Sequence, residues 1–152
     1  MREVLILVRT YDCRKVLITL GSHIVTGYSD GTFVSIEPNG DGFTKKVGCD
    51  GEVGRSRDPD ETAKVTLTLM LTSPTVAWCQ QQYVRDRDTG EGFFPILIKD
   101  LKGGLVFQSA TAWVVKPPVR DFDKEGPDRE IEIDCGDATW EGETFGGFNP
   151  QP

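Results

Sequence analysis

Apolar and polar residues alternate with a period of two along most of this chain, and this pattern restricts its fold more than any other feature. In REIEIDC, the segment that ends at Cys135, apolar residues alternate with acidic ones. The segments 15–20 and 63–71 show the same alternation, with Val, Ile and Leu on one face. Because successive strand side chains point to opposite faces of a sheet, these runs predict half-buried antiparallel strands. Further strands are expected at 23–26, 32–37, 93–99 and 105–116, with a hairpin turn at 100–104.

One helix is predicted within this β-rich chain. Ser73 is a suitable N-cap, and Pro74 suits the first helical position because its missing N–H would have no partner there. The helix should end between Arg85 and Thr89, before Gly90. Apolar side chains recur at helical spacing at Val76, Cys79 or Gln80, and Tyr83. The residues themselves therefore predict a mainly antiparallel β domain that carries one helix.

Length and charge narrow the range of functions. The 152 residues fit one domain, and their formal net charge of −7 argues against a protein that grips phosphates, because such binding requires a basic surface. The apolar run Val4–Val8 is too short for a signal-peptide core or a membrane span, so no membrane association is expected. A first strand or an apolar arm is the simpler interpretation of this run. The chain is expected to fold in a cytosol.

The glycine-rich span Ile36–Asp58 could be a calcium loop, a phosphate loop or a long connection between two strands. With Gly42 at the sixth position of a calcium loop, the twelfth position is Gly48, which has no side chain to bind the ion. No phosphate-loop motif occurs between a strand and a helix. We therefore interpret the span as a long excursion between strands, with a short strand at 43–47 and a tight turn at Asp50-Gly51.

Residues suited to catalysis or metal binding are scarce. His23 is the only histidine, and the four cysteines have no C-x-x-C spacing, so neither a catalytic triad nor a zinc site is indicated. No pair of carboxylates is singled out by its position. Trp78, Trp113 and Trp140 could stack on a sugar, although core packing explains the first two. The sequence predicts no enzyme, no cofactor and no metal, and free thiols are the simplest expectation for the cysteines.

Four segments resemble the tail tube protein of contractile-tailed bacteriophages, and they occur in one order along the chain. They are TGYSDGTFVSIE, VGCDGEVGRSRD, FPILIKDL and AWVVKPP. The resemblance covers Thr10 to Cys135, most of the chain. It implies an antiparallel β-sandwich or partial barrel of two packed sheets with one flanking α-helix. It also implies a single β domain at 1–135, which includes an extended inter-strand assembly loop at 39–57, and a C-terminal arm at 136–152.

The resemblance further implies a structural, non-enzymatic function. Six subunits of such a protein form a ring, the rings stack into a hollow tube, and genomic DNA passes through the lumen into the host without specific binding. The implied partners are other copies of the chain and the tail sheath, tape measure, baseplate and tail terminator proteins. The expected location is the virion tail, after assembly in the host bacterial cytoplasm. An acidic lumen would let DNA slide, because like charges repel.

Candidate contact residues follow from these expectations. The long excursion is the natural element to reach the next ring, and the spaced aromatic residues of the tail suggest docking on a neighbour. The expected contact residues are Asn39, Asp41, Phe43, Cys49, Asp50, Arg55, Arg57, Trp140, Phe145 and Phe148. The candidate acidic residues of the lumen are Glu37, Glu130, Glu132 and Asp134.

Two cysteines depart from the family's pattern. The position of Cys13 is usually a proline and that of Cys49 a small residue such as alanine, and both lie in predicted loops. We hypothesise a disulfide between subunits through Cys13 and Cys49, formed after release into oxidising surroundings, with free thiols as the alternative. Cys135 ends a strand on its apolar face and is expected to be buried, whereas Cys79 on the helix could be buried or exposed.

Two other functions stay open at this point. The chain could be the tube subunit of a related contractile injection system or of a long non-contractile tail. It could also be a monomeric β-sandwich module that binds a glycan through Trp and Tyr side chains. A tube subunit should form rings or tubes, whereas the glycan-binding module should remain a monomer at high concentration.

Overall fold

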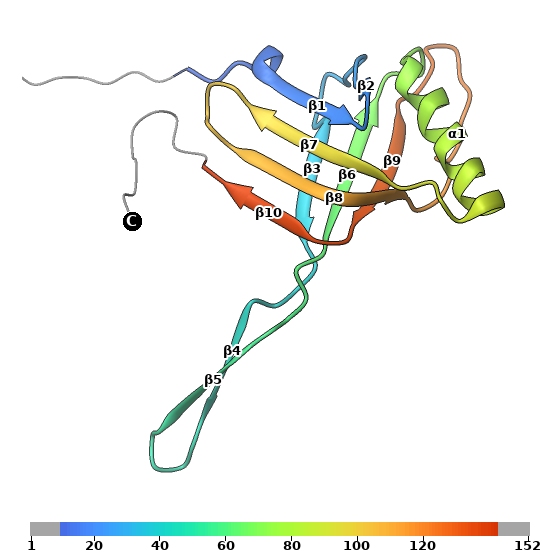
Figure 1. The fold of residues 1–152 in the computed structure, drawn as a ribbon. Helices are drawn as coiled ribbons and strands as arrows, with labels where there is room; N and C mark the ends of the chain where they lie inside the picture. The colour runs from blue at the N-terminus through green and yellow to red at the C-terminus, as the bar shows by residue number, and fades with distance from the viewer. Residues whose placement is uncertain (1–9, 143–152) are drawn as a thin grey trace, which may run out of the picture.

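The alternating segments form one strongly curved antiparallel sheet and a separate two-stranded hairpin, and a helix covers one end of the sheet (Figure 1). The computed structural model describes residues 10–142. The elements, in chain order, are η1 (Cys13–Lys15), β1 (Val16–Leu20), β2 (His23–Ile24), β3 (Val34–Pro38), β4 (Phe43–Val47), β5 (Val53–Arg57), β6 (Ala63–Leu69), α1 (Pro74–Thr89), β7 (Phe94–Asp100), β8 (Val106–Val114), β9 (Arg129–Cys135) and β10 (Ala138–Glu141).

The strand β8 bends the sheet into a partial barrel because it has neighbours in both halves. The strand order is β2-β1-β7-β8-β9-β6-β3, and β10 pairs with the first part of β8. Residues 106–109 of β8 pair with β10 and β7, whereas Ala112–Val114 pair with β9 and Ala112 also pairs with Phe94 of β7. Between these parts the register against β7 shifts, and the Ser109 hydroxyl bonds with both the N–H and the carbonyl of Thr111. Such an irregularity bends a strand, so β7, β8 and β10 cross in front of β9, β6 and β3 (Figure 1).

This architecture confirms the mainly antiparallel β fold with one helix, and the two halves of the curved sheet enclose the core. The strands turn alternate residues inward, as in β9, where Ile131, Ile133 and Cys135 are fully buried. Each buried Val, Leu, Ile or Phe side chain stabilises the fold by roughly 1.5–3 kcal/mol. The buried apolar residues are Val16, Ile18, Leu20, Val25, Ala63, Val65, Leu67, Leu69, Cys79, Phe94, Ile96, Ile98, Phe107, Ala112, Val114, Ile131, Ile133 and Cys135.

The helix α1 begins and ends at the predicted capping residues. The Ser73 hydroxyl accepts a hydrogen bond from the Thr75 N–H and donates one to the Thr26 carbonyl, which ties the start of the helix to the segment after β2. Gly90 follows the last helical residue with φ 72°, and its N–H donates to the Asp86 carbonyl. Glycine adopts this left-handed conformation without steric cost, so the helix ends there.

Two strands are not predicted by the sequence pattern. β5 is exposed along its whole length, so it has no buried face to produce an apolar alternation. β10 has one large apolar residue, Trp140, whose ring packs edge-on against Phe107 with 4.8 Å between the centroids. The first part of the expected C-terminal arm is therefore a strand of the sheet, and residues 143–152 lie outside the described part of the chain.

Candidate assembly surfaces

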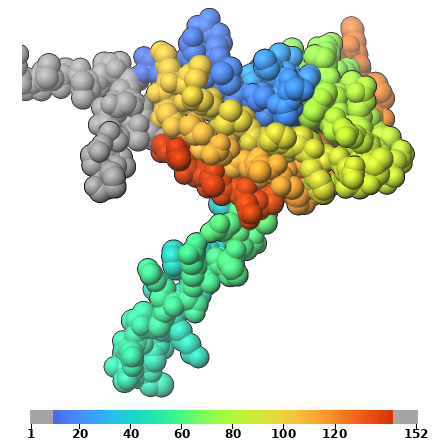
Figure 2. All heavy atoms as spheres, in the orientation of Figure 1, coloured from blue at the N-terminus to red at the C-terminus, as the bar shows by residue number. Residues whose placement is uncertain are grey.

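The strands β4 and β5 form a two-stranded arm, residues 43–57, that projects from the sheet (Figures 1 and 2). Within residues 10–142 these strands pair only with each other, and every residue of both is exposed. The predicted strand at 43–47 is confirmed, and so is the tight turn near Asp50, where the Gly51 N–H donates to the Gly48 carbonyl at 3.0 Å. Because an isolated two-stranded hairpin is marginally stable in water, this arm is suited to a partner that covers it.

The two faces of the arm differ in chemistry, since residues that pair across an antiparallel hairpin share a face. The pairs on one face are Phe43–Arg57, Lys45–Arg55 and Val47–Val53, whereas those on the other are Thr44–Ser56 and Lys46–Gly54. We call the first the basic–apolar face. On it, the Arg55 guanidinium lies over the Phe43 ring, 4.4 Å from the centroid. The Phe43, Val47 and Val53 side chains are 57%, 58% and 61% exposed, so this face is uncovered.

Hydrogen bonds close the base of the arm where it leaves the sheet. The Asp41 N–H donates to the Asp58 carboxylate at 2.9 Å, and the Asn39 N–H donates to the Thr62 carbonyl at 3.0 Å. The backbone N–H groups of Asp41 and Asp60 stabilise the ionised carboxylate and hold the pKa of Asp58 below its usual value. The direction of the arm is therefore fixed at its base, although β4 and β5 pair with no other strand of residues 10–142.

The structure separates the predicted contact residues into distinct places. Asn39 and Asp41 lie at the base of the arm, Phe43, Arg55 and Arg57 on its basic–apolar face, and Cys49 and Asp50 in the turn at its tip. Trp140 lies on β10 in the body, and Phe145 and Phe148 lie outside the described residues. Sequence reasoning missed Lys45, because its place on the basic–apolar face becomes visible only with the hairpin register that pairs it with Arg55.

The four carboxylates expected to line a lumen lie together on one face of the sheet. Three of them, Glu130, Glu132 and Asp134, alternate with the buried residues of β9. In the strand register, Lys64 of β6 lies between Asp134 of β9 and Glu37 of β3. The Lys64 ammonium pairs with Glu132 at 3.3 Å. This acidic face thus places Glu37, Glu132 and Asp134 near Lys64, with Glu130 further along β9 opposite Thr68. Its orientation towards a lumen stays a prediction.

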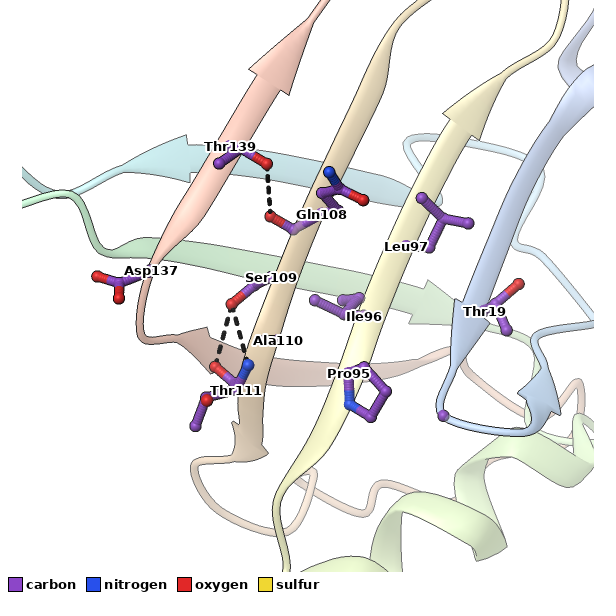
Figure 3. A pocket seen from close by; sticks show the side chains of 11 residues that line it. Thr19, Pro95, Ile96, Leu97, Gln108, Ser109, Ala110, Thr111, Asp137 and Thr139 are labelled. Atoms are coloured by element: carbon purple, nitrogen blue, oxygen red, sulfur yellow. Dashed lines mark hydrogen bonds between the residues drawn. The ribbon is translucent and has the colours of Figure 1, made fainter.

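A shallow hollow of about 550 Å³ lies over β1, β7, β8 and β10 (Figure 3). Small and apolar side chains such as Thr19, Leu97 and Thr139 line it, and Asp137 is its one charged residue. The Thr139 hydroxyl donates to the Gln108 carbonyl at 3.4 Å. The lining contains no histidine, cysteine or pair of carboxylates, so this hollow has no arrangement suited to acid–base or nucleophilic catalysis.

Other residues considered from the sequence have packing contacts. The His23 ring stacks on Trp78 with 5.2 Å between centroids, and its Nε2 lies 2.8 Å from the Thr75 hydroxyl. The three tryptophans pack against different rings: Trp78 against Phe94, Trp113 against Phe93 and Trp140 against Phe107. Within residues 10–142, no group of His, Cys, Asp and Glu side chains could hold a metal ion. In the same range, no helix is both long and apolar enough to span a membrane.

The four cysteines divide by exposure. Cys79 and Cys135 are buried, and burial raises the pKa of each thiol to about 12. Cys13 in η1 and Cys49 at the tip of the arm are exposed. The expected burial of Cys135 is confirmed, and the helical Cys79 also belongs to the core.

Comparisons with known proteins agree with this geometry. The chain is 30% identical over 122 residues to structural protein ORF10 of Pseudomonas phage KPP10, and the match covers 79% of this chain and 70% of the relative. A chain from the tube-terminating cap of the anti-feeding prophage has a TM-score of 0.66 at 14% identity, covering 92% of this chain and 96% of that one. A chain from the PVC sheath–tube complex, part of an extracellular contractile injection system, has a TM-score of 0.59 at 11% identity, covering 88% and 92%. A chain from the native gene transfer agent virion has a TM-score of 0.58 at 12% identity, covering 88% and 100%. No family model matches the chain.

The curved sheet, the flanking helix and the projecting arm define a structural protein with a tail-tube-like fold. The resemblance to phage tail tube proteins that the sequence motifs indicate is thereby confirmed. The chain belongs to the family of phage structural proteins that includes ORF10 of phage KPP10.

The burial of two thiols predicts their reactivity. At pH 8 a maleimide should label Cys13 and Cys49 rapidly in the folded protein, and all four cysteines after unfolding.

The folded protein retains the protons of Cys79 and Cys135 at a pH where the unfolded chain, with a thiol pKa of 9.0, releases them. The free energy of unfolding should therefore be insensitive to these thiols below pH 9 and should fall as the pH rises from 9 towards 12. Urea unfolding of the protein and of its Cys79→Ala variant at pH 8 and pH 10 measures this difference, and rapid labelling of a third thiol in the folded protein would contradict the burial.

Proposed function

We propose that this chain is the tube subunit of a contractile-tailed phage. Six copies form a ring, the rings stack into a hollow tube, and genomic DNA leaves the particle through its lumen without specific binding. The observation that carries the proposal is the arm, residues 43–57, whose basic–apolar face is uncovered by any described part of its own chain. On a tail-tube-like fold, the simplest role for such a face is contact with another subunit.

The free edges of the sheet support assembly into rings. β3 ends the strand order and has one partner, β6, and β10 pairs with β8 alone among the described strands. An unpaired strand edge presents N–H and carbonyl groups to other chains and invites pairing. Neighbouring copies in a ring cover such edges, which removes the tendency to aggregate without order.

The remaining parts of the proposal concern partners and location. The role is structural rather than enzymatic, and assembly takes place in the host bacterial cytoplasm before the tail joins the virion. The tail sheath, tape measure, baseplate and tail terminator proteins are the other partners of such a tube. A non-contractile tail would share the tube without the sheath.

A second candidate is the tube subunit of a related contractile injection system, favoured by the likeness to the anti-feeding prophage and PVC chains. A sheath gene without capsid genes nearby would support it. A monomeric glycan-binding module is disfavoured, because the three tryptophans pack against separate rings instead of forming one platform.

Removal of the arm should abolish stacking while the rest of the chain still folds. Residues 42 and 58 are joined at the base by a hydrogen bond of 2.7 Å, so two glycines can replace residues 43–57 without straining the sheet. We expect this variant to unfold within about 4 °C of the full chain, because the arm buries none of the core. We expect it to form no tubes by electron microscopy or sedimentation.

The full chain under the same conditions is the control and should form tubes. A strictly monomeric full chain at high concentration would sink the proposed function. Tubes of normal length from the armless variant would show that stacking uses another surface.

The end of the acidic face that carries Glu37 and Asp134 is the candidate lumen lining. Glu37 and Asp134 flank Lys64 in the strand register, and an acidic lining repels phosphates, whereas a basic lining would hold them by counterion release. DNA then slides through the tube instead of adhering to it.

Charge reversal tests this lining. The Glu37→Lys and Asp134→Lys changes add positive charge on either side of Lys64 in the strand register. We expect tubes of normal appearance and slower DNA ejection, with a delay that shrinks as salt is raised because added ions screen the attraction. Glu91→Lys, on the exposed segment after α1, is the matched control. Ejection at the unaltered rate would remove this face from the lumen.

The two exposed cysteines remain candidates for a bond between subunits. Cys49 lies at the tip of the arm and Cys13 in η1, at the opposite end of the molecule in Figure 1, so a bond would join one copy to the next rather than close within a chain. Two thiols form one disulfide by giving two protons and two electrons to an oxidant such as dioxygen, which the oxidising surroundings supply after release.

Non-reducing electrophoresis of purified particles tests the disulfide. We expect dimers or higher species that disappear on reduction and are missing from the Cys13→Ser and Cys49→Ser variants. A single monomer band from particles whose thiols were alkylated at lysis would exclude the bond.

A further inference from the structure

We propose that the basic–apolar face of the arm binds an acidic groove on the next copy of this chain, formed by β9 and the segment between β8 and β9. This inference rests on the proposed stacking of subunits and identifies the surface that receives the arm. The groove has a volume of about 310 Å³ and is bordered by residues of the segment 116–121 and of 128–132.

The arm has an excess of positive charge within an acidic chain. Four basic and two acidic residues lie in 43–57, out of 17 basic and 24 acidic residues in the whole chain. The rest of the chain therefore holds 13 basic and 22 acidic residues, a net charge of −9 against +2 for the arm. Arg57 pairs with Glu61 at 2.8 Å, but Lys45 and Arg55 have no ion pair among the described residues. Two cations of the basic–apolar face are thus available to a partner.

The groove offers the complementary charge. Its acidic residues are Asp121, Asp128, Glu130 and Glu132, and Lys116 is its one basic residue. Glu132 pairs with Lys64, and Asp128 accepts a hydrogen bond from Ser29, so these two have structural partners. Asp121 and Glu130 are exposed and have no ion pair within residues 10–142. The groove therefore presents two unpaired carboxylates to the two unpaired cations of an arm.

Apolar surface beside these carboxylates suits the apolar residues of the arm. Pro117, Pro118 and Val119 line the groove; Pro118 is buried, Pro117 is half-buried and Val119 is 74% exposed. Prolines lose little conformational entropy when a partner covers them, because their φ angles are already fixed. Phe43, Val47 and Val53 on the arm supply the matching apolar area between the cations. The combination of apolar contact with flanking ion pairs is typical of specific interfaces.

A buried arginine holds the wall of the groove in place. Arg129 is 2% exposed, and its guanidinium donates to the Asp121 carbonyl at 3.0 Å and to the Pro127 carbonyl at 3.2 Å. The same guanidinium lies 5.3 Å from the centroid of the Phe122 ring. On the helix side, Arg120 donates to Gln80 of α1 at 2.8 Å. These contacts fix the segment before an arm arrives, which lowers the cost of ordering it on binding.

The positions of the arm and the groove favour stacking over pairing. The segment between β8 and β9 lies beside α1, at the far side of the body from the arm (Figures 1 and 2). A contact between different surfaces at opposite ends of identical subunits is heterologous, and it repeats from copy to copy instead of closing into a dimer. This geometry matches rings that add along one axis.

Charge exchange between the two surfaces tests the inference. We expect the double variant Lys45→Glu, Arg55→Glu to lower the fraction of protein in tubes about tenfold at low salt. The double variant Asp121→Lys, Glu130→Lys should have the same effect. Each places like charges across the interface. Combining all four changes should restore tubes to within about threefold of the full chain, since the opposite charges then face each other again. Electron microscopy and sedimentation measure the tubes, and thermal unfolding of the disassembled subunits verifies that each variant is folded.

The arm supplies its own matched control. Lys46→Glu makes the same charge change on the neighbouring residue of β4, which lies on the opposite face of the arm. It should leave stacking intact where Lys45→Glu weakens it.

Normal tubes from the Asp121→Lys, Glu130→Lys variant, or no recovery in the combined variant, would overturn the groove as the receptor. If the arm variants instead lose binding to DNA in a filter assay and stack normally, the arm contacts nucleic acid and the inference is wrong. The proposed function fails separately, when the full chain itself forms no tubes.

Discussion

The bend of β8 between Ser109 and Ala112 is the constraint on which the rest of the molecule depends. Before the bend the strand pairs with β7 and β10, and after it with β9 and, at Ala112, still with Phe94 of β7. One continuous strand therefore belongs to both halves of the sheet. This continuity turns the apolar faces of the two halves towards each other, and Phe107 and Val114 enter the core from opposite sides of the bend. The curved sheet leaves β3 at an edge, paired only with β6 among the described strands, and the arm extends from this pair.

A single net charge conceals how the ionisable residues are distributed. The value of −7 combines an acidic body with a short basic arm. Four of the acidic residues lie on the outer faces of β3 and β9, where alternate positions point away from the core and carry no apolar requirement. The basic residues of the arm occur on strands with no buried side, so their arrangement is decided by cross-strand register. In the proposed stack, electrostatic interaction between copies therefore uses side chains that lie outside the core.

The body was largely predictable from sequence, and the arm was only partly so. Period-two alternation identifies β1, β6 and β9 because one face of each strand is buried, and Ser73, Pro74 and Gly90 bound the helix through local backbone chemistry. The same rule misses β5, which is solvated on both sides, and β10, whose four residues are too few to show a period. The sequence identified the acidic residues of β3 and β9 only as separate candidates. The register that brings Glu37, Lys64 and Asp134 into one row depends on the pairing of strands far apart in the chain. The predicted strand at 43–47 already places Lys45 and Lys46 on opposite faces, but only the hairpin register pairs Lys45 with Arg55.

The placement of the arm makes any stack of these subunits directional. In a stack joined arm to body, one end exposes a layer of unoccupied basic hairpins and the other a layer of unoccupied acidic surface. The two ends then differ in charge and shape, so a protein that closes one end does not fit the other. A different protein that starts such a stack needs a surface that resembles one side of the subunit. The last exposed layer stays open to further addition until a cap blocks it, so the length of the assembly cannot be encoded in the subunit alone.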